Sequence, residues 1–246
     1  DRVALGKGGI VANKGGLAIE LHVDGTPLLI VATHLAAHDH AINKRNKQAG
    51  VILGELSRRC KLGIGRERPG YESKMDLLSE FDHCLWIGDL NYRIDLGIGE
   101  LKQPSPPAQR ASLAASSSAE GITSDEGSYS GYNQEGSYYV DKDRVMESVN
   151  KVSSLIEQES WASLTAADQL LHAQQCGHAL TGFRESPLNF PPTFKVRRTL
   201  APSVKQAYIA PKNPSKARIP SWCDRILLRS MPHATDRVQI KRTWPA

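Results

Sequence analysis

The stretch HCLWIGDLNYR, residues 83–93, passes abruptly from an apolar segment into a polar one. Residues 83–88 have the length and composition of a buried strand. The polar residues after them occupy a loop, and loops at strand ends are where a rigid scaffold usually presents reactive groups. The stretch therefore predicts a sheet whose strand ends carry chemistry.

Two further strands are expected upstream of this one. Apolar residues alternate from Leu17 to Val23, Asp24-Gly25 gives a tight-turn signal, and PLLIVATHL follows. This pattern predicts a β-hairpin. Its second strand is apolar nearly throughout, as in a sheet covered on both faces, and delivers His34 at its C-terminal end. A final strand is expected in RIPSWCDRILL, residues 218–228.

Helical periodicity appears between these strands. It runs from Asn43 to Leu62, returns at Val145, Val149, Val152 and Ile156, and begins again near Thr165. Residues 187–196 indicate a loop and a short strand. Because strands and helices mix without a regular βαβ repeat, the pattern predicts an α/β (α+β) enzyme fold, two-layered or sandwiched.

Residues 103–137 are rich in Ser, Ala, Gly and Pro. Such a composition buries too little apolar area to offset an ordering entropy of about 1–2 kcal/mol per residue. We therefore expect a disordered insertion within one domain that spans residues 1–246.

Composition restricts the class of protein. The chain has 246 residues, 40% hydrophobic and 23% charged, and no apolar run long enough to span a bilayer. Its four cysteines are widely separated and form no zinc pattern, so reduced thiols in an intracellular compartment are expected. The net charge of +5 suits phosphorylated small molecules, acidic membrane or nucleic acid, or simply a solvated surface.

Four polar clusters fall at expected strand ends: NKGG (13–16), THLAAH (33–38), GDLNYR (88–93) and PSWCDR (220–225). Asp89 and Asn91 stand two apart, so on an extended backbone both side chains project to one side. A carboxylate that accepts a proton beside an amide that holds an oxygen is suited to activating water. The alternative is a turn in which both residues bond their own backbone.

The histidines and lysines allow further assignments. His34 ends a strand, so a phosphate donor is a better role for it than a zinc ligand, and His38 and His40 are expected at the surface. Lys14 lies in a glycine-rich turn that lacks the P-loop ending. Several cations crowd the approach to the last strand, where plain solvation is the alternative: Lys195, Lys205, Lys212, Lys216 and Arg218.

Taken in order, THLAAH, WIGDLNYRI, DQL, PPTFK and RIPSWCDRIL resemble the successive signatures of the inositol polyphosphate 5-phosphatase catalytic domain. The resemblance runs from about Asn13 to Leu228. It implies the fold of the endonuclease/exonuclease/phosphatase superfamily: a DNase I-like four-layer sandwich with two mostly antiparallel central sheets between helices. It also implies Mg²⁺-assisted hydrolysis of the inositol ring 5-phosphate.

Residue by residue, the resemblance implies that Asp89 and Asn91 activate and position the attacking water and that His34 donates to the scissile phosphate. Asp224 would orient a histidine near the C-terminus of the domain. Lys195, Lys216 and Arg218 match positions that grip the neighbouring 4-phosphate. Arg225 would help to frame the phosphate site. Two further residues are expected to bind substrate: Arg93, and Lys14 as a point charge for a phosphate.

Departures from the family pattern are informative. The family's metal-binding Glu would precede Asp1, and its terminal Asp-His pair does not follow Asp224, so we expect a catalytic domain truncated at both ends whose metal ligands are not identified. Phe194 and Val196 stand where the family often has aromatic residues, Tyr at the first.

Three functional hypotheses follow. The first is a Mg²⁺-dependent phosphatase acting on phosphoinositides or soluble inositol polyphosphates. This would be a monomeric, cytoplasmic domain in peripheral contact with acidic membrane. The second is an inactive phosphoinositide-binding pseudoenzyme. The third is a nuclease of the same superfamily, which PTFK and KARIPSWCDR disfavour, so no nucleic-acid partner is expected.

Overall fold

The structure is a computed structural model that describes residues 2–5, 14–59, 77–97, 142–196, 207–208, 213 and 216–238. The expected insertion at 103–137 lies outside the described residues, as do Lys205 and Lys212. Within the described part, no helix is both long and apolar enough to cross a membrane.

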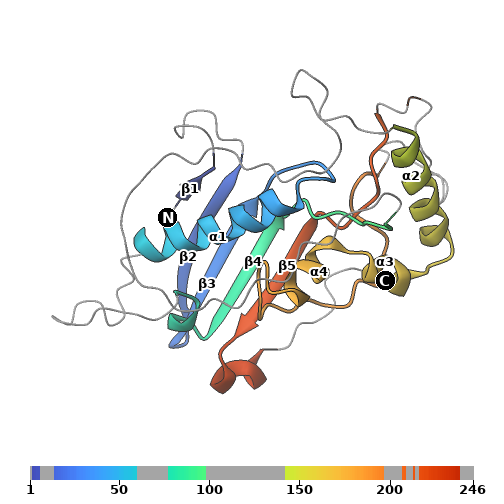
Figure 1. Ribbon diagram of the computed structural model, residues 1–246. Coiled ribbons are helices and arrows are strands. Elements are labelled where there is room, and N and C mark those ends of the chain that lie inside the picture. Colours follow the sequence, from blue (N-terminus) through green and yellow to red (C-terminus); the bar gives the residue numbers. More distant parts are fainter. Residues whose placement is uncertain are drawn as a thin grey trace.

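The centre of the fold is a five-stranded sheet with strand order β1-β2-β3-β4-β5 (Figure 1). Neighbouring strands are antiparallel except β3 and β4, which are parallel. The strands are β1 (Arg2–Ala4), β2 (Gly15–Val23), β3 (Thr26–His34), β4 (His83–Asp89) and β5 (Asp224–Ser230). The predicted hairpin is confirmed, with β2 and β3 joined through Asp24 and Gly25, both at positive φ.

Helix α1 (Ile42–Arg59) follows β3 and makes the crossover that parallel pairing requires, packing against β1 and β2. A short 3₁₀ turn, η2 (Leu77–Glu80), precedes β4, and another, η4 (Pro232–Arg237), follows β5. Helix α2 (Lys142–Glu157) confirms the periodicity that begins at Val145.

Two predictions in this region need correction. The helix expected to begin near Thr165 is divided into α3 (Trp161–Ala166) and α4 (Gln169–Gln175). Asp168 separates them because its carboxylate accepts the backbone N–H groups of Leu170 and Leu171 as an N-cap. The short strand expected in 187–196 is a single bridge between Phe194 and Ser221.

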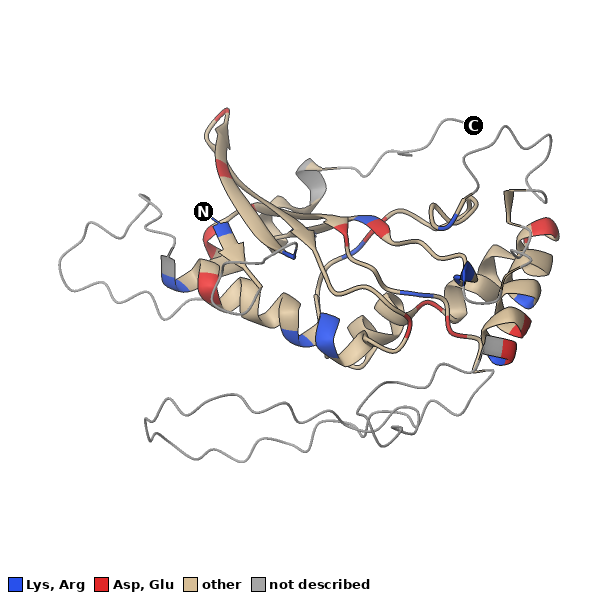
Figure 2. Ribbon diagram, turned by 90° about the horizontal axis from the view of Figure 1, so that it is seen from above, with Lys and Arg blue, Asp and Glu red and all other residues tan. Residues whose placement is uncertain are grey.

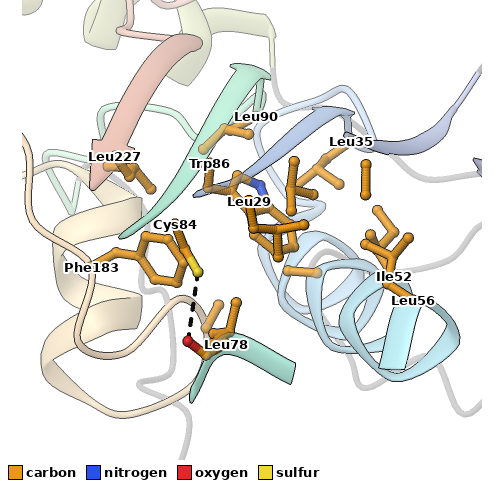
Figure 3. Close-up of a cluster of buried hydrophobic side chains, with 14 of the residues drawn as sticks. Leu29, Leu35, Ile52, Leu56, Leu78, Cys84, Trp86, Leu90, Phe183 and Leu227 are labelled. Atoms are coloured by element: carbon orange, nitrogen blue, oxygen red, sulfur yellow. Dashed lines mark hydrogen bonds between the residues drawn. The ribbon is translucent and has the colours of Figure 1, made fainter. Parts of the chain in front are cut away.

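The main hydrophobic core lies between the sheet and α1 (Figure 3). Trp86 is fully buried there, and its ring meets Phe183 edge-on at 6.1 Å between centroids. A second cluster joins α2 and α3 to the segment before β5, with Trp222 at its centre. The two clusters hold the two segments that carry polar motifs, Trp86–Arg93 and Pro220–Arg225, against the helical layer.

The other face of the sheet is exposed. Its large apolar side chains are 41–51% accessible: Leu17, Ile19, Leu21 and Val23 on β2, and Ile226 on β5. The strands therefore lie under helices on one face only, within the part of the chain that the structure describes. The structure describes one of the two sheets that the sequence led us to expect, and this sheet is mixed.

Candidate functional site

The polar residues meet at the edge of the sheet where β3 and β4 end and β5 begins. Strand register places His34 opposite Asp89 and Asp89 opposite Asp224, with Gly15 of β2 next to His34. Three candidate residues that are widely separated in sequence thus form one row across the sheet. We call Gly15, His34, Asp89 and Asp224 the polar row.

His34 lies between an acid and a base. Its Nε2 is 3.3 Å from Asp89 Oδ2 and also contacts Lys14 Nζ. One ring nitrogen serves only one of these partners at a time, because it donates to Asp89 when protonated and accepts from Lys14 when not. The His34 side chain is 47% exposed, so a phosphate can reach it. Burial lowers the pKa of Lys14; Asp89 opposes this shift and Arg93 adds to it.

Asn91 is placed differently from the prediction. Its φ of 56° lies in the left-handed region, so the backbone after β4 is not extended and Asn91 does not project beside Asp89. The buried amide turns inward: Nδ2 donates to Leu35 O at 3.1 Å and Oδ1 accepts from Arg93. Asp89 Oδ1 accepts the Asn91 backbone N–H at 3.1 Å, so the alternative of a turn is confirmed for the Asp89 side chain but not for that of Asn91. Asp89 Oδ2 remains directed at His34.

Arg93 is 3% exposed and supports this loop. Its Nε donates to Asn91 O at 3.1 Å, and the guanidinium carbon lies 4.3 Å from the centre of the Phe194 ring. Its Nη1 is buried and has no hydrogen-bond partner among the residues that the structure describes.

Arg225 contradicts the prediction that it frames a phosphate. Its side chain is 1% exposed, and its Nη1 donates to both oxygens of Asp168 at 3.0 and 2.9 Å. Nε donates to Glu185 Oε2 at 2.9 Å, and Nη2 to Glu185 Oε1. Burial alone would lower the Arg225 pKa, but the two carboxylates outweigh it and raise the pKa. Arg225 follows Asp224 in β5 and therefore points to the opposite face, into the core.

Asp224 is exposed in the polar row. Thr193 Oγ1 donates to its Oδ2 at 3.4 Å. Burial and repulsion from Asp89 raise the Asp224 pKa, while Thr193 and His34 act in the opposite direction. His233 does not serve as its partner, because it bonds Asp82 at 2.9 Å beyond the other end of β5.

The cations assigned to a neighbouring phosphate come from two segments. Lys195 lies on one, and Lys216 and Arg218 lie on the other; all three are exposed. The Phe194–Ser221 bridge brings the two segments together, with Phe194 N donating to Ser221 O at 3.0 Å. His38 and His40 are also exposed, as predicted, and their rings stack at 5.8 Å.

A divalent metal fits this edge in part. Among the described residues, no three His, Cys, Asp or Glu side chains gather as ligands. Asp89 and Asp224 are nonetheless neighbours by register, and a cation between them would relieve their repulsion. Two carboxylates suit Mg²⁺, which commonly takes one or two protein carboxylates and completes its shell with water and substrate phosphate.

The sequence interpretation missed several buried polar groups, among them Arg45, which is fully buried on α1. The sequence pattern that could have revealed Arg45 is a charged residue in line with the apolar face of a helix. Arg45 stands at i, and the apolar residues Ala49, Ile52 and Leu56 follow at i+4, i+7 and i+11.

Comparisons with known proteins identify the family of the chain. The model of the Endonuclease/Exonuclease/phosphatase family 2 matches residues 1–132 and 141–243. Synaptojanin-1 of Rattus norvegicus is 27% identical over 245 residues, 100% of this chain and 10% of that protein. The type I inositol polyphosphate 5-phosphatase 2 of Arabidopsis thaliana is 25% identical over 227 residues, 92% of this chain and 26% of that protein.

A solved structure shows the same fold. The inositol polyphosphate 5-phosphatase domain of SPsynaptojanin, in complex with inositol (1,4)-bisphosphate and calcium ion, superposes with a TM-score of 0.55 at 22% identity. The match covers 94% of this chain and 46% of that chain. This chain thus spans between a tenth and about a quarter of the two curated relatives. The family model nevertheless covers nearly all of it, and the chain belongs to the Endonuclease/Exonuclease/phosphatase family 2.

Proposed function

We propose that the chain is the catalytic part of a phosphatase that removes the 5-phosphate from phosphoinositides or soluble inositol polyphosphates. The observation that carries the proposal is the polar row, in which strand register brings His34, Asp89 and Asp224 to one edge. Both curated relatives cover most of this chain, and one is named an inositol polyphosphate 5-phosphatase.

Asp89, His34 and Lys14 have separate roles in the proposed phosphoryl transfer. Asp89 Oδ2 accepts the proton of the attacking water, and protonated His34 Nε2 donates to the scissile phosphate. When Nε2 carries this proton it does not accept from Lys14, so the Lys14 ammonium can add its positive charge at the phosphate. Phosphoryl transfer depends mainly on positioning and charge neutralisation, so a rim of cations beside two carboxylates is adequate chemistry.

The family depends on a divalent metal, and we infer that Mg²⁺ serves here. Asp224, with Asp89 beside it, would hold the ion. When bound, Mg²⁺ supplies charge that stabilises the phosphate oxygens. Asn91 has an indirect role: its side chain holds the loop after β4 in place through hydrogen bonds with Leu35 O and Arg93.

The neighbouring phosphate of the inositol ring is bound by Lys195, Lys216 and Arg218. Their exposure and the net charge of +5 also favour peripheral contact with an acidic membrane surface. We propose that the domain is monomeric and works in the cytoplasm, where these substrates present their headgroups.

A second candidate function is binding without hydrolysis. The inward placement of the Asn91 amide favours it, because both ends of that amide are already bonded to protein groups. An inactive binder would keep the cationic rim and bind inositol phosphates without releasing phosphate.

Phosphate release separates these functions. The full chain is incubated with phosphatidylinositol 4,5-bisphosphate vesicles, soluble inositol trisphosphate or plasmid DNA, each with Mg²⁺ or chelator. We expect Mg²⁺-dependent phosphate release from an inositide and no DNA cleavage. Binding of inositol phosphate without release would support the inactive binder, and nicked plasmid would support a nuclease.

Substitution of the proposed base tests the assignment at Asp89. We expect Asp89→Asn to lower kcat by on the order of 10²-fold or more, because the amide accepts no proton from water. His40→Ala is the control, since His40 is exposed and outside the polar row. Unchanged kcat in Asp89→Asn would remove Asp89 from catalysis.

A further inference from the structure

Helix α4 begins beside two loops that extend from the polar row. The first loop follows His34, and the second carries Asn91 and Arg93. Gln169, the first residue of α4, is 5% exposed and contacts both loops through its side chain.

Each end of the Gln169 amide has a protein partner. Oε1 accepts the backbone N–H of Arg93 at 3.0 Å and the Nη2 of Arg45 at 2.6 Å. Nε2 donates to Asp39 O at 3.1 Å. The Gln169 backbone N–H also donates to Arg93 O at 2.9 Å. One side chain thus bridges the loop at 35–39 and the loop at 90–93.

Arg45 extends the link. Its Nη1 donates to the carbonyl oxygens of Ala36 at 3.1 Å and His38 at 2.6 Å. Burial lowers the pKa of this guanidinium to about 10, with Tyr92 and Asp39 raising it and Arg93 lowering it further. At neutral pH the buried cation is charged, and its bonds to carbonyl oxygens are correspondingly strong.

We propose that Gln169 is a positioning residue for the phosphatase reaction, fixing the loop after His34 relative to the loop that holds Asn91 and Arg93. This inference rests on the proposed function. Neither loop is a strand or helix. Apart from Gln169, the contacts between them include the hydrogen bond from Asn91 Nδ2 to Leu35 O. They also include an ion pair between Arg93 Nε and Asp39 Oδ1 at 3.9 Å. A misplacement of about 1 Å at reacting groups can lower rate by on the order of 10²-fold.

The chain supplies a matched control. Gln174 lies on the same helix, and its Nε2 donates to Leu180 O at 3.1 Å and Phe183 O at 3.0 Å, away from both loops. Gln169→Leu and Gln174→Leu remove the same chemical group from the same helix. Both variants should lose thermal stability, but only Gln169→Leu should alter the site.

The kinetic test uses the full chain with Mg²⁺ and an inositide substrate. We expect Gln169→Leu to lower kcat by on the order of 10²-fold with a much smaller change in KM, while Gln174→Leu keeps kcat within about threefold. Gln169→Glu keeps the acceptor for Arg45 and Arg93 and should recover part of the lost kcat. Equal loss of kcat in both leucine variants would reduce Gln169 to a structural role and overturn the proposal.

Amide hydrogen exchange provides a readout independent of activity. Gln169→Leu removes the acceptor of the Arg93 amide, so exchange should accelerate in peptides covering 35–41 and 89–95 but not 180–184. Unchanged exchange there would also overturn the proposal. If the unmodified chain releases no phosphate, the proposed function fails, whereas the exchange result still shows whether Gln169 fixes these loops.

Discussion

The face of β5 from which a side chain projects determines the different roles of Asp224 and Arg225. Asp224 and Arg225 are adjacent in sequence, yet one faces the polar row and the other is buried with Asp168 and Glu185. The sequence predicted the position of Asp224 through the strand end. It did not predict the partners of Arg225, because both carboxylates are distant in sequence.

The buried triad of Arg225, Asp168 and Glu185 makes Arg225 a stability residue. Arg225→Lys should lower the free energy of unfolding by about 3–5 kcal/mol, because a point charge cannot bond both carboxylates as the planar guanidinium does. Urea denaturation measures the loss. If stability were unchanged and KM rose instead, Arg225 would regain a role in substrate binding.

Ionisation of the Asp224 carboxyl makes the stability of the fold depend on pH. Its pKa is raised by burial and by Asp89, so the folded state holds this proton more tightly than the unfolded state does. Ionisation therefore costs stability as pH rises above the unfolded pKa of about 3.9. We expect Asp224→Asn to have a higher thermal midpoint than the unmodified chain at pH 7.

Measuring the thermal midpoints of Asp224→Asn and the unmodified chain again at lower pH provides the control. The advantage of Asp224→Asn should shrink as pH falls toward the unfolded pKa, where Asp224 is protonated in both states. A difference in midpoint that does not vary with pH would show that charge on Asp224 is not its cause.

At the scale of elements, close packing between β3 and β4 brings the polar row together. Gly88 has a φ of +121°, and a Cβ there would lie 2.1 Å from Thr33 O. The sequence alone does not explain why a glycine precedes Asp89. The structure does, because the neighbouring strand β3 approaches Gly88 too closely for a side chain. Likewise, the helical pattern predicted α1 and α2 well, whereas Asp168 divided the third predicted helix by capping α4.

Gly88→Ala should separate the ends of β3 and β4. The added methyl group meets backbone that has no room to move and demands a φ that costs of order 1–3 kcal/mol. We expect reduced stability in urea together with reduced kcat. Gly54 is the opposite case, because it is exposed on α1 and a Cβ there would meet nothing within 4 Å. Gly54→Ala should therefore raise the free energy of unfolding by about 0.5–1 kcal/mol. Equal effects at the two glycines would refute the close-approach argument.

For the whole molecule, the dominant feature is the difference between the two faces of the sheet. The pattern of β3 led us to expect cover on both sides, yet among the described residues the helices lie on one. Figure 2 shows acidic and basic segments mainly on helices and loops, with few on the strands. Apolar alternation predicted the strands, but it carries no information about which layer covers each face.

Two identical substitutions measure this difference. Val23 is 51% exposed on β2, and Val31 is 1% exposed on β3. Val23→Thr should change the free energy of unfolding by no more than about 0.5 kcal/mol, whereas Val31→Thr should cost about 1–3 kcal/mol by burying a hydroxyl. Comparable losses at both positions would show that the apolar face of β2 is covered in solution.

Two tryptophans that are buried in the described part of the chain give the molecule an intrinsic fluorescent probe. Trp86 lies in the core beneath the sheet and donates to Thr33 Oγ1, while Trp222 lies in the second cluster and donates to Phe190 O. Trp86 lies just before the GDLNYR motif, and Trp222 lies within the PSWCDR motif. Indole emission shifts to longer wavelength on contact with water. The sequence also contains Trp161 and Trp244. In a chain with both of these replaced by Phe, adding Trp86→Phe or Trp222→Phe would leave fluorescence that follows one motif at a time. The light emitted by this chain thus reports whether both halves of its site unfold together.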